Sequence, residues 1–96
     1  MALILVVDDS PVEQHVYSQV LKQRGYETIT ANDGEEAVSI ARDKKPDLII
    51  MDVVMPGMNG FQATRKLQKH PDTAGIPVII ISTKKQETDK IWALRQ

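Results

Sequence analysis

Cysteine is absent from the 96-residue chain, which excludes disulfide bonds, thiol catalysis and sulfur-ligated zinc. Twelve Lys and Arg residues against thirteen Asp and Glu residues leave a net charge of −1. This balance offers no positive surplus for a nucleic acid or an anionic membrane surface, so neither is expected as a partner. The longest apolar run, residues 3–7, is far shorter than the ~18 residues that a membrane span needs. We therefore expect no membrane insertion and a cytoplasmic location.

The composition indicates one small globular domain covering residues 1–96. Hydrophobic side chains make up 42% and charged side chains 26%, close to the average of soluble domains. Domains run from roughly 50 to 250 residues, so a two-domain enzyme is excluded.

Short apolar runs alternate with amphipathic stretches, the pattern of repeated strand–helix units in a parallel sheet. The run at residues 3–7 is continuously apolar, which predicts a central strand covered on both faces. We expect strands at residues 3–7, 26–31, 48–51 and 78–81, and helices at residues 11–24, 35–44, 61–69 and 88–96. The second strand contains polar residues and is expected nearer the edge, whereas the other three are expected to be buried.

The first helix has clear start and stop signals. Ser10 can cap it, Pro11 suits its first position, and Gly25 can supply the left-handed stop. Its expected apolar stripe consists of Val12, Val16 and Val20, with Tyr17 and Leu21. In the last predicted helix, Ile91 and Leu94 are expected to point inward and Trp92 to be exposed.

Polar side chains end the three apolar strands. Asp8 and Asp9 follow the first, Asp52 follows the third, and Ser82 with Thr83 follows the fourth. The carboxyl ends of parallel strands meet at one edge, where ligands bind in open α/β sheets. Several carboxylates gathered there repel one another and favour a cation. An all-oxygen cluster without His or Cys points to Mg²⁺.

Each of these signals alone has an ordinary structural explanation. An acidic pair after a strand is commonly a solvated loop or a helix cap, and Asp52 could be a polar strand terminus. Ser82 and Thr83 could simply begin a connection. Their occurrence at the ends of three apolar strands favours a functional site.

The motifs resemble the receiver domains of two-component response regulators. The matching segments are residues 6–10, 47–52, 55–60 and 77–82, in order and at appropriate distances. Within that family, residues 59–64 and 83–90 resemble the small stand-alone receivers of type IV pilus twitching-motility systems.

The resemblance implies a fold. It is the flavodoxin-like, doubly wound α/β fold with a parallel sheet in the order 2-1-3-4 and a fifth strand and helix that would lie beyond Gln96. We therefore expect a receiver domain that is C-terminally incomplete. Its fourth strand would form a sheet edge, with self-association through that strand and the following helix.

The resemblance also implies residue roles. Asp52 would accept a phosphoryl group from a histidine kinase or phosphotransfer domain. Asp8, Asp9, Asp52 and the backbone carbonyl of Val54 would bind Mg²⁺. Ser82 would donate a hydrogen bond to the phosphoryl group and act in the switch that alters contacts with a downstream protein. Such a protein is not an enzyme beyond assisting its own phosphotransfer and dephosphorylation.

Three other functions compete with this interpretation. A hydrolase of the aspartyl-phosphate type has a second Asp two residues after its nucleophile, but position 54 is Val. A flavodoxin-like cofactor binder would present hydroxyls and amides to phosphate, whereas Asp8 and Asp9 would repel it. A phosphorylation-independent interaction module is the principal alternative, because the phosphate-binding Lys of the family would lie beyond Gln96.

Overall fold

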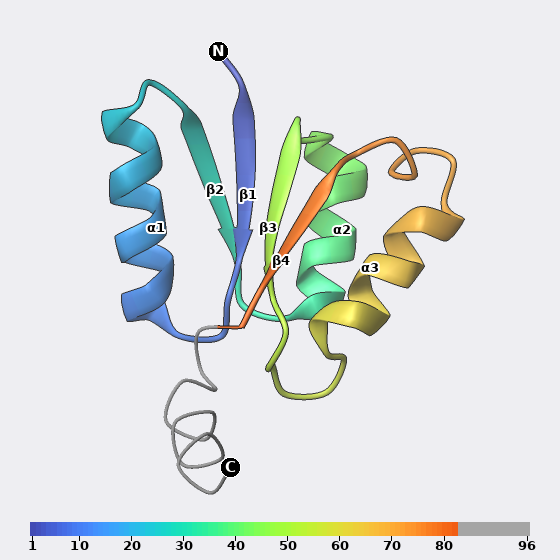
Figure 1. Ribbon diagram of the computed structural model, residues 1–96. Coiled ribbons are helices and arrows are strands. Elements are labelled where there is room, and N and C mark those ends of the chain that lie inside the picture. Colours follow the sequence, from blue (N-terminus) through green and yellow to red (C-terminus); the bar gives the residue numbers. More distant parts are fainter. Residues whose placement is uncertain (83–96) are drawn as a thin grey trace, which may run out of the picture.

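The computed structural model describes residues 1–82. They form a four-stranded parallel sheet in the order β2-β1-β3-β4, which confirms the predicted topology. The strands are β1 (Leu3–Val7), β2 (Glu27–Ala31), β3 (Leu48–Asp52) and β4 (Val78–Ile81). The helices are α1 (Pro11–Gln23), α2 (Gly34–Lys44) and α3 (Gly60–Lys69). Helix α1 covers one face of the sheet, and α2 and α3 cover the other (Figure 1).

The main core lies between the two central strands and the α2–α3 layer. Its buried residues are Leu5, Val7, Ala31, Ala37, Ala41, Ile49, Met51, Met55, Ala63 and Leu67. The continuously apolar sequence of β1 follows from its central position, since Ile4 and Val6, which alternate with the core residues Leu5 and Val7, are also buried.

The helix boundaries follow their capping residues. Ser10 Oγ accepts a hydrogen bond from Glu13 N at 3.3 Å and caps α1 as predicted. Gly25 follows α1 with φ of +90°, which confirms the left-handed stop. Helices α2 and α3 each begin one residue earlier than predicted, because Asp33 and Asn59 are their N-caps. Strand β2 begins one residue later, and β3 extends one residue further.

The prediction that the α1 valines form a stripe against the core is wrong. Val12, Val16 and Val20 are 70%, 49% and 50% exposed, whereas Ser18 is buried. At 3.6 residues per turn, the valines form a row displaced around the helix from the half-buried Tyr17. The sequence showed an apolar row but not the rotation of the helix on its sheet.

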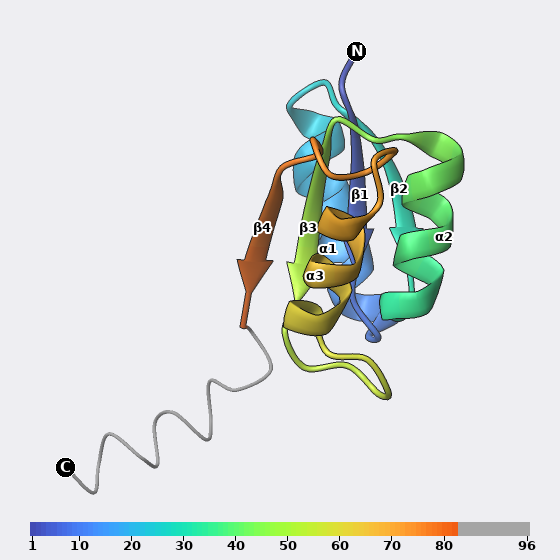
Figure 2. The ribbon, with the colours of Figure 1, turned by 90° about the vertical axis from the view of Figure 1, so that its right-hand side faces the viewer.

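Within the described residues β4 is an edge strand, as the resemblance implied, whereas the prediction from its apolar run that it is buried is wrong. Strand β4 lies at the margin of the four-stranded sheet (Figure 2). Its register aligns Ile79 with Ile50, on the α1 face, and Ile79 is 52% exposed. Val78 and Ile80 pack against the main core on the opposite face.

Two further findings concern the helices. Within residues 1–82, no helix combines the length and apolar character needed to cross a membrane. The predicted helix at residues 88–96, with Ile91, Trp92 and Leu94, lies outside the described residues.

Candidate acidic site at the carboxyl edge of the sheet

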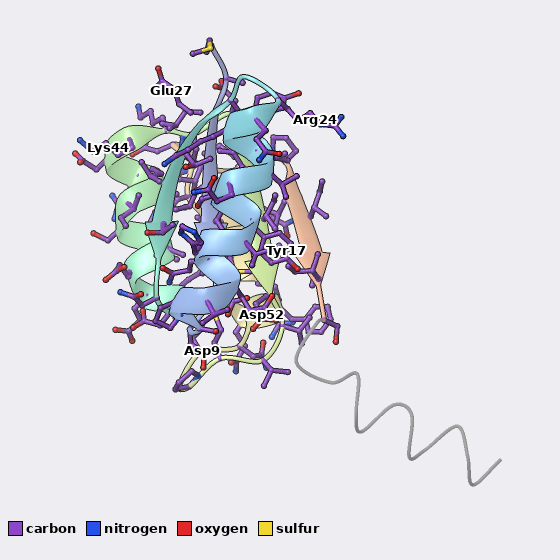
Figure 3. The ribbon with its side chains drawn as sticks, turned by 90° about the vertical axis from the view of Figure 1, so that its left-hand side faces the viewer. Asp9, Tyr17, Arg24, Glu27, Lys44 and Asp52 are labelled. Carbon is purple, nitrogen blue, oxygen red and sulfur yellow. The ribbon has the colours of Figure 1, made fainter. Side chains whose placement is uncertain are left out.

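Three aspartates meet where β1 and β3 end. Asp8 and Asp9 directly follow β1, and Asp52 is the last residue of β3. Each offers a carboxylate oxygen, and these oxygens lie within 4.8 Å of one another. Figure 3 shows Asp9 and Asp52 at the same end of the molecule. The structure thus brings together the three carboxylates that the sequence predicts to be neighbours.

Hydrogen bonds hold Asp8 and its loop in place. Ser10 N donates to Asp8 Oδ1 at 2.9 Å, which couples this carboxylate to the start of α1. The two N–H groups of Gln14 Nε2 donate to the Asp8 carbonyl at 2.6 Å and to Asn32 Oδ1 at 2.8 Å, and the Ala31 carbonyl shares in this bonding at 3.3 Å. One side chain of α1 therefore joins the loops that follow β1 and β2.

The environment of Asp52 favours its protonated form. Asp52 and Asp8 are both fully buried, with no solvent-exposed surface. Burial raises the pKa of Asp52 from 3.8 to about 6, and the negative charge of Asp8 adds to this increase. Hydrogen bonds from the backbone of Val54 and Val53 oppose the increase, and the charge of Glu13 supports it. A cation among these carboxylates would remove much of their mutual repulsion.

Val54, the predicted backbone ligand, lies in the loop between β3 and α3 and is half-buried. This loop is fixed at both ends. Val53 N donates to the Ile81 carbonyl at 2.9 Å, and Gly60 N donates to the Val53 carbonyl at 3.0 Å. Asn59 and Gln62 then form a reciprocal capping box with two 2.9 Å bonds.

Ser82 follows β4 directly and is exposed. The register pairs Asp52 with Ile81, so Ser82 leaves the sheet at the same edge as the aspartates. Thr83, Lys84 and Lys85 lie outside the described residues.

The donor set fits a hard divalent cation. Asp8, Asp9 and Asp52 supply carboxylate oxygens, the ligands that Mg²⁺ prefers in proteins. Because two of the three are buried, a bound cation would be partly shielded from water. Such a site can bring an anionic phosphoryl group close to a carboxylate nucleophile.

Three residues that contribute to this edge could not be identified from the sequence. Glu13 lies in the first turn of α1, and the sequence gives no sign that its charge reaches Asp52. Gln14 gave no signal, since its role depends on two loops meeting in space. Gly60 falls just before the predicted helix at residues 61–69, and nothing in the sequence shows that it lies against Asp52.

Comparison with known proteins places these observations in a family. Residues 4–96 match the family model described as the response regulator receiver domain. The chain is 53% identical over 96 residues to Protein PilH of Pseudomonas aeruginosa, covering the whole chain and 79% of PilH.

Solved structures agree with this match. The receiver domain of a sensor histidine kinase from Pseudomonas aeruginosa superposes with a TM-score of 0.82 at 31% identity, covering 94% of this chain and 74% of that one. That receiver domain holds a magnesium ion coordinated in its active-site cleft. The chemotaxis protein CheY4 of Vibrio cholerae gives a TM-score of 0.79 at 35% identity, covering 95% and 79% of the two chains.

Proposed function

The chain belongs to the response regulator receiver domain family, and from this membership we propose that Asp52 accepts a phosphoryl group with the help of Mg²⁺. The observation that carries the proposal is the meeting of three carboxylates within 4.8 Å at the carboxyl edge of the sheet. A histidine kinase or a phosphotransfer domain would be the donor. The protein is a signalling module, and its chemistry is limited to its own phosphorylation and dephosphorylation.

The transfer is a displacement at phosphorus. An Asp52 carboxylate oxygen attacks the phosphorus of a phosphohistidine, the P–N bond breaks, and the imidazole leaves with the bonding electron pair. Asp52 then carries an acyl phosphate. Because a carboxylate is a weak nucleophile, positioning and charge neutralisation supply most of the rate enhancement. With a pKa of about 6, Asp52 is mostly ionised at neutral pH and can attack.

Asp8, Asp9, Asp52 and the Val54 carbonyl would hold the magnesium ion. When bound, Mg²⁺ neutralises charge between the acceptor carboxylate and the incoming phosphoryl oxygens. Asp9 is less buried than Asp8, and we assign it the direct contact with the ion. A hydrogen bond from the backbone of Val54, with a smaller contribution from Val53, helps to orient the Asp52 carboxylate.

Ser82 would couple phosphorylation of Asp52 to a structural change at the protein surface. It is exposed and follows the strand that pairs with Asp52, so an added phosphoryl group on Asp52 has a hydroxyl donor within the same sheet edge. A hydrogen bond from Ser82 would draw the chain after β4 toward the site. We propose that this change alters the contact with a downstream protein in the control of pilus-based motility, by analogy with PilH.

Intact-mass spectrometry after incubation with acetyl phosphate tests the acceptor. The wild type should gain one phosphoryl group with Mg²⁺ and none with EDTA. Asp52→Ala should gain none, whereas Asp43→Asn, a change at an exposed side chain, should behave as wild type. If wild type and Asp52→Ala are modified equally, Asp52 is not the acceptor. If neither is modified with Mg²⁺, the result favours a phosphorylation-independent interaction module.

A further inference from the structure

Gly60, the first residue of α3, lies against the backbone of the proposed acceptor. Figure 2 shows the start of α3 beside the end of β3. A Cβ atom added at this position would lie 3.0 Å from both the carbonyl carbon of Asp52 and Cα of Val53, and closer still to the Asp52 carbonyl oxygen. All three atoms belong to the backbone and cannot rotate away as a side chain could. The absence of a side chain at position 60 therefore sets how closely α3 approaches the end of β3.

Helix α3 has little freedom to retreat from this contact. Gly60 N donates to the Val53 carbonyl at 3.0 Å, which ties the first residue of α3 to the chain that follows β3. Further along the helix, Ala63 and Leu67 are fully buried in the main core. A group inserted between α3 and β3 would displace the end of the strand as well as the helix.

The residues next to this contact are those assigned to phosphoryl transfer. Asp52 carries the acceptor carboxylate, and Val54 supplies the proposed backbone ligand two residues later. The Gly60–Val53 hydrogen bond closes the loop that contains Val54. A shift of the Val53 backbone changes the direction of the Asp52 carboxylate and the position of the Val54 carbonyl together.

We infer that Gly60 is a positioning residue, whose lack of a side chain lets α3 fix the Asp52–Val54 backbone in the geometry that binds Mg²⁺ and accepts a phosphoryl group. The inference rests on the proposed function. It also predicts that Gly60→Ala is harmful, whereas a Gly→Ala substitution within a helix ordinarily stabilises the protein.

Two other glycines provide matched comparisons. A Cβ at Gly75 would meet nothing within 4 Å, so Gly75→Ala is the neutral control. A Cβ at Gly34 would lie 3.1 Å from Met58 Cβ and Sδ and 3.2 Å from Ala63 Cβ. Gly34→Ala therefore presses on the same loop and helix through looser contacts: Met58 Sδ can rotate away, whereas the Cβ atoms of Met58 and Ala63 can yield only if the loop and α3 shift slightly.

The experiment is a Mg²⁺ titration by calorimetry of the three variants, with acetyl phosphate labelling followed in parallel. We expect Gly60→Ala to weaken Mg²⁺ binding about tenfold or more, Gly34→Ala roughly two- to fivefold and Gly75→Ala not at all, with labelling rates falling in the same order. Binding and labelling by Gly60→Ala equal to Gly75→Ala would overturn the inference. If Gly60→Ala does not fold, Gly34→Ala decides: wild-type affinity in that variant, with an intact circular dichroism spectrum, would also overturn it.

Amide spectra of the metal-free proteins separate this inference from the proposed function. If the wild type neither binds Mg²⁺ nor accepts phosphoryl groups, the proposed function fails independently of Gly60. In that case, the amide signals of Val53 and Val54 test whether Gly60 fixes the position of the Asp52–Val54 backbone. They should shift in Gly60→Ala and not in Gly75→Ala, and equal spectra in this loop would refute it.

Discussion

Replacing Asp52 by Asn should stabilise the metal-free protein at neutral and alkaline pH. The folded-state pKa of Asp52 is raised from 3.8 to about 6, first by burial and then by the charge of Asp8. A carboxyl with a raised pKa binds its proton more tightly when folded, so it opposes folding increasingly as the pH rises from about 4 to above 6. That difference in pKa corresponds to about 3 kcal/mol, present in full only when Asp52 is ionised.

The assay is urea unfolding of wild type and Asp52→Asn in EDTA at several pH values. We expect nearly equal free energies of unfolding at pH 4 and a gain of about 2–3 kcal/mol for Asp52→Asn at pH 8. Asp43→Asn, at a side chain 76% exposed, is the matched control and should show no such dependence.

Magnesium should reverse much of this difference. A ligand at 100 times its Kd stabilises the folded state by about 2.7 kcal/mol, and Asp52→Asn loses one of the charged ligands. A gain that is the same at pH 4 and pH 8, or that is unaffected by Mg²⁺, would refute the electrostatic reasoning.

Three other measurements follow from the same structure. Asp9→Ala should weaken Mg²⁺ binding roughly tenfold or more by calorimetry, and Asp8→Ala less; equal affinities for Asp9→Ala and wild type would remove Asp9 from the site. Leu67→Ala, in the core, should cost about 2–5 kcal/mol in urea unfolding, whereas Phe61→Ala, 51% exposed on the same helix, should cost less than about half as much. Ile79→Lys should reduce concentration-dependent association in light scattering after size exclusion, and a wild-type chain that stays monomeric at high concentration would contradict association through the β4 edge.

The fold was largely predictable because its signals are local. The continuous apolar runs at residues 3–7 and 48–51 identify central strands, since only a strand covered on both faces can be apolar throughout. Ser10 and Gly25 mark the ends of the first helix through capping chemistry that depends on a few neighbouring residues. The proximity of Asp8, Asp9 and Asp52 could be predicted because the carboxyl ends of parallel strands meet at a common edge.

The errors concern features that depend on tertiary arrangement. The four-residue spacing of Val12, Val16 and Val20 defines a row on a helix, but the rotation of that helix depends on what its neighbouring rows contact. The apolar sequence of β4 is the same whether one or both faces are covered, so its exposed Ile79 could not be read from the pattern. The Gly60 contact was equally hidden, because it joins the start of a helix to the end of a strand eight positions earlier.

The four strands within residues 1–82 run in one direction, so the two ends of the sheet suit different labels. The N-terminus lies at the opposite end of the sheet from Asp9 and Asp52 (Figures 1 and 3). A fluorophore or affinity tag joined to Met1 would therefore be separated from the acidic site by the length of β1. A label at Ser82 would instead stand at the edge where phosphorylation is proposed, next to the partner strand of Asp52. Because such a label replaces the Ser82 hydroxyl to which the switch is assigned, energy transfer from a label at Met1 would report the position of this edge and not the movement that the hydroxyl would cause.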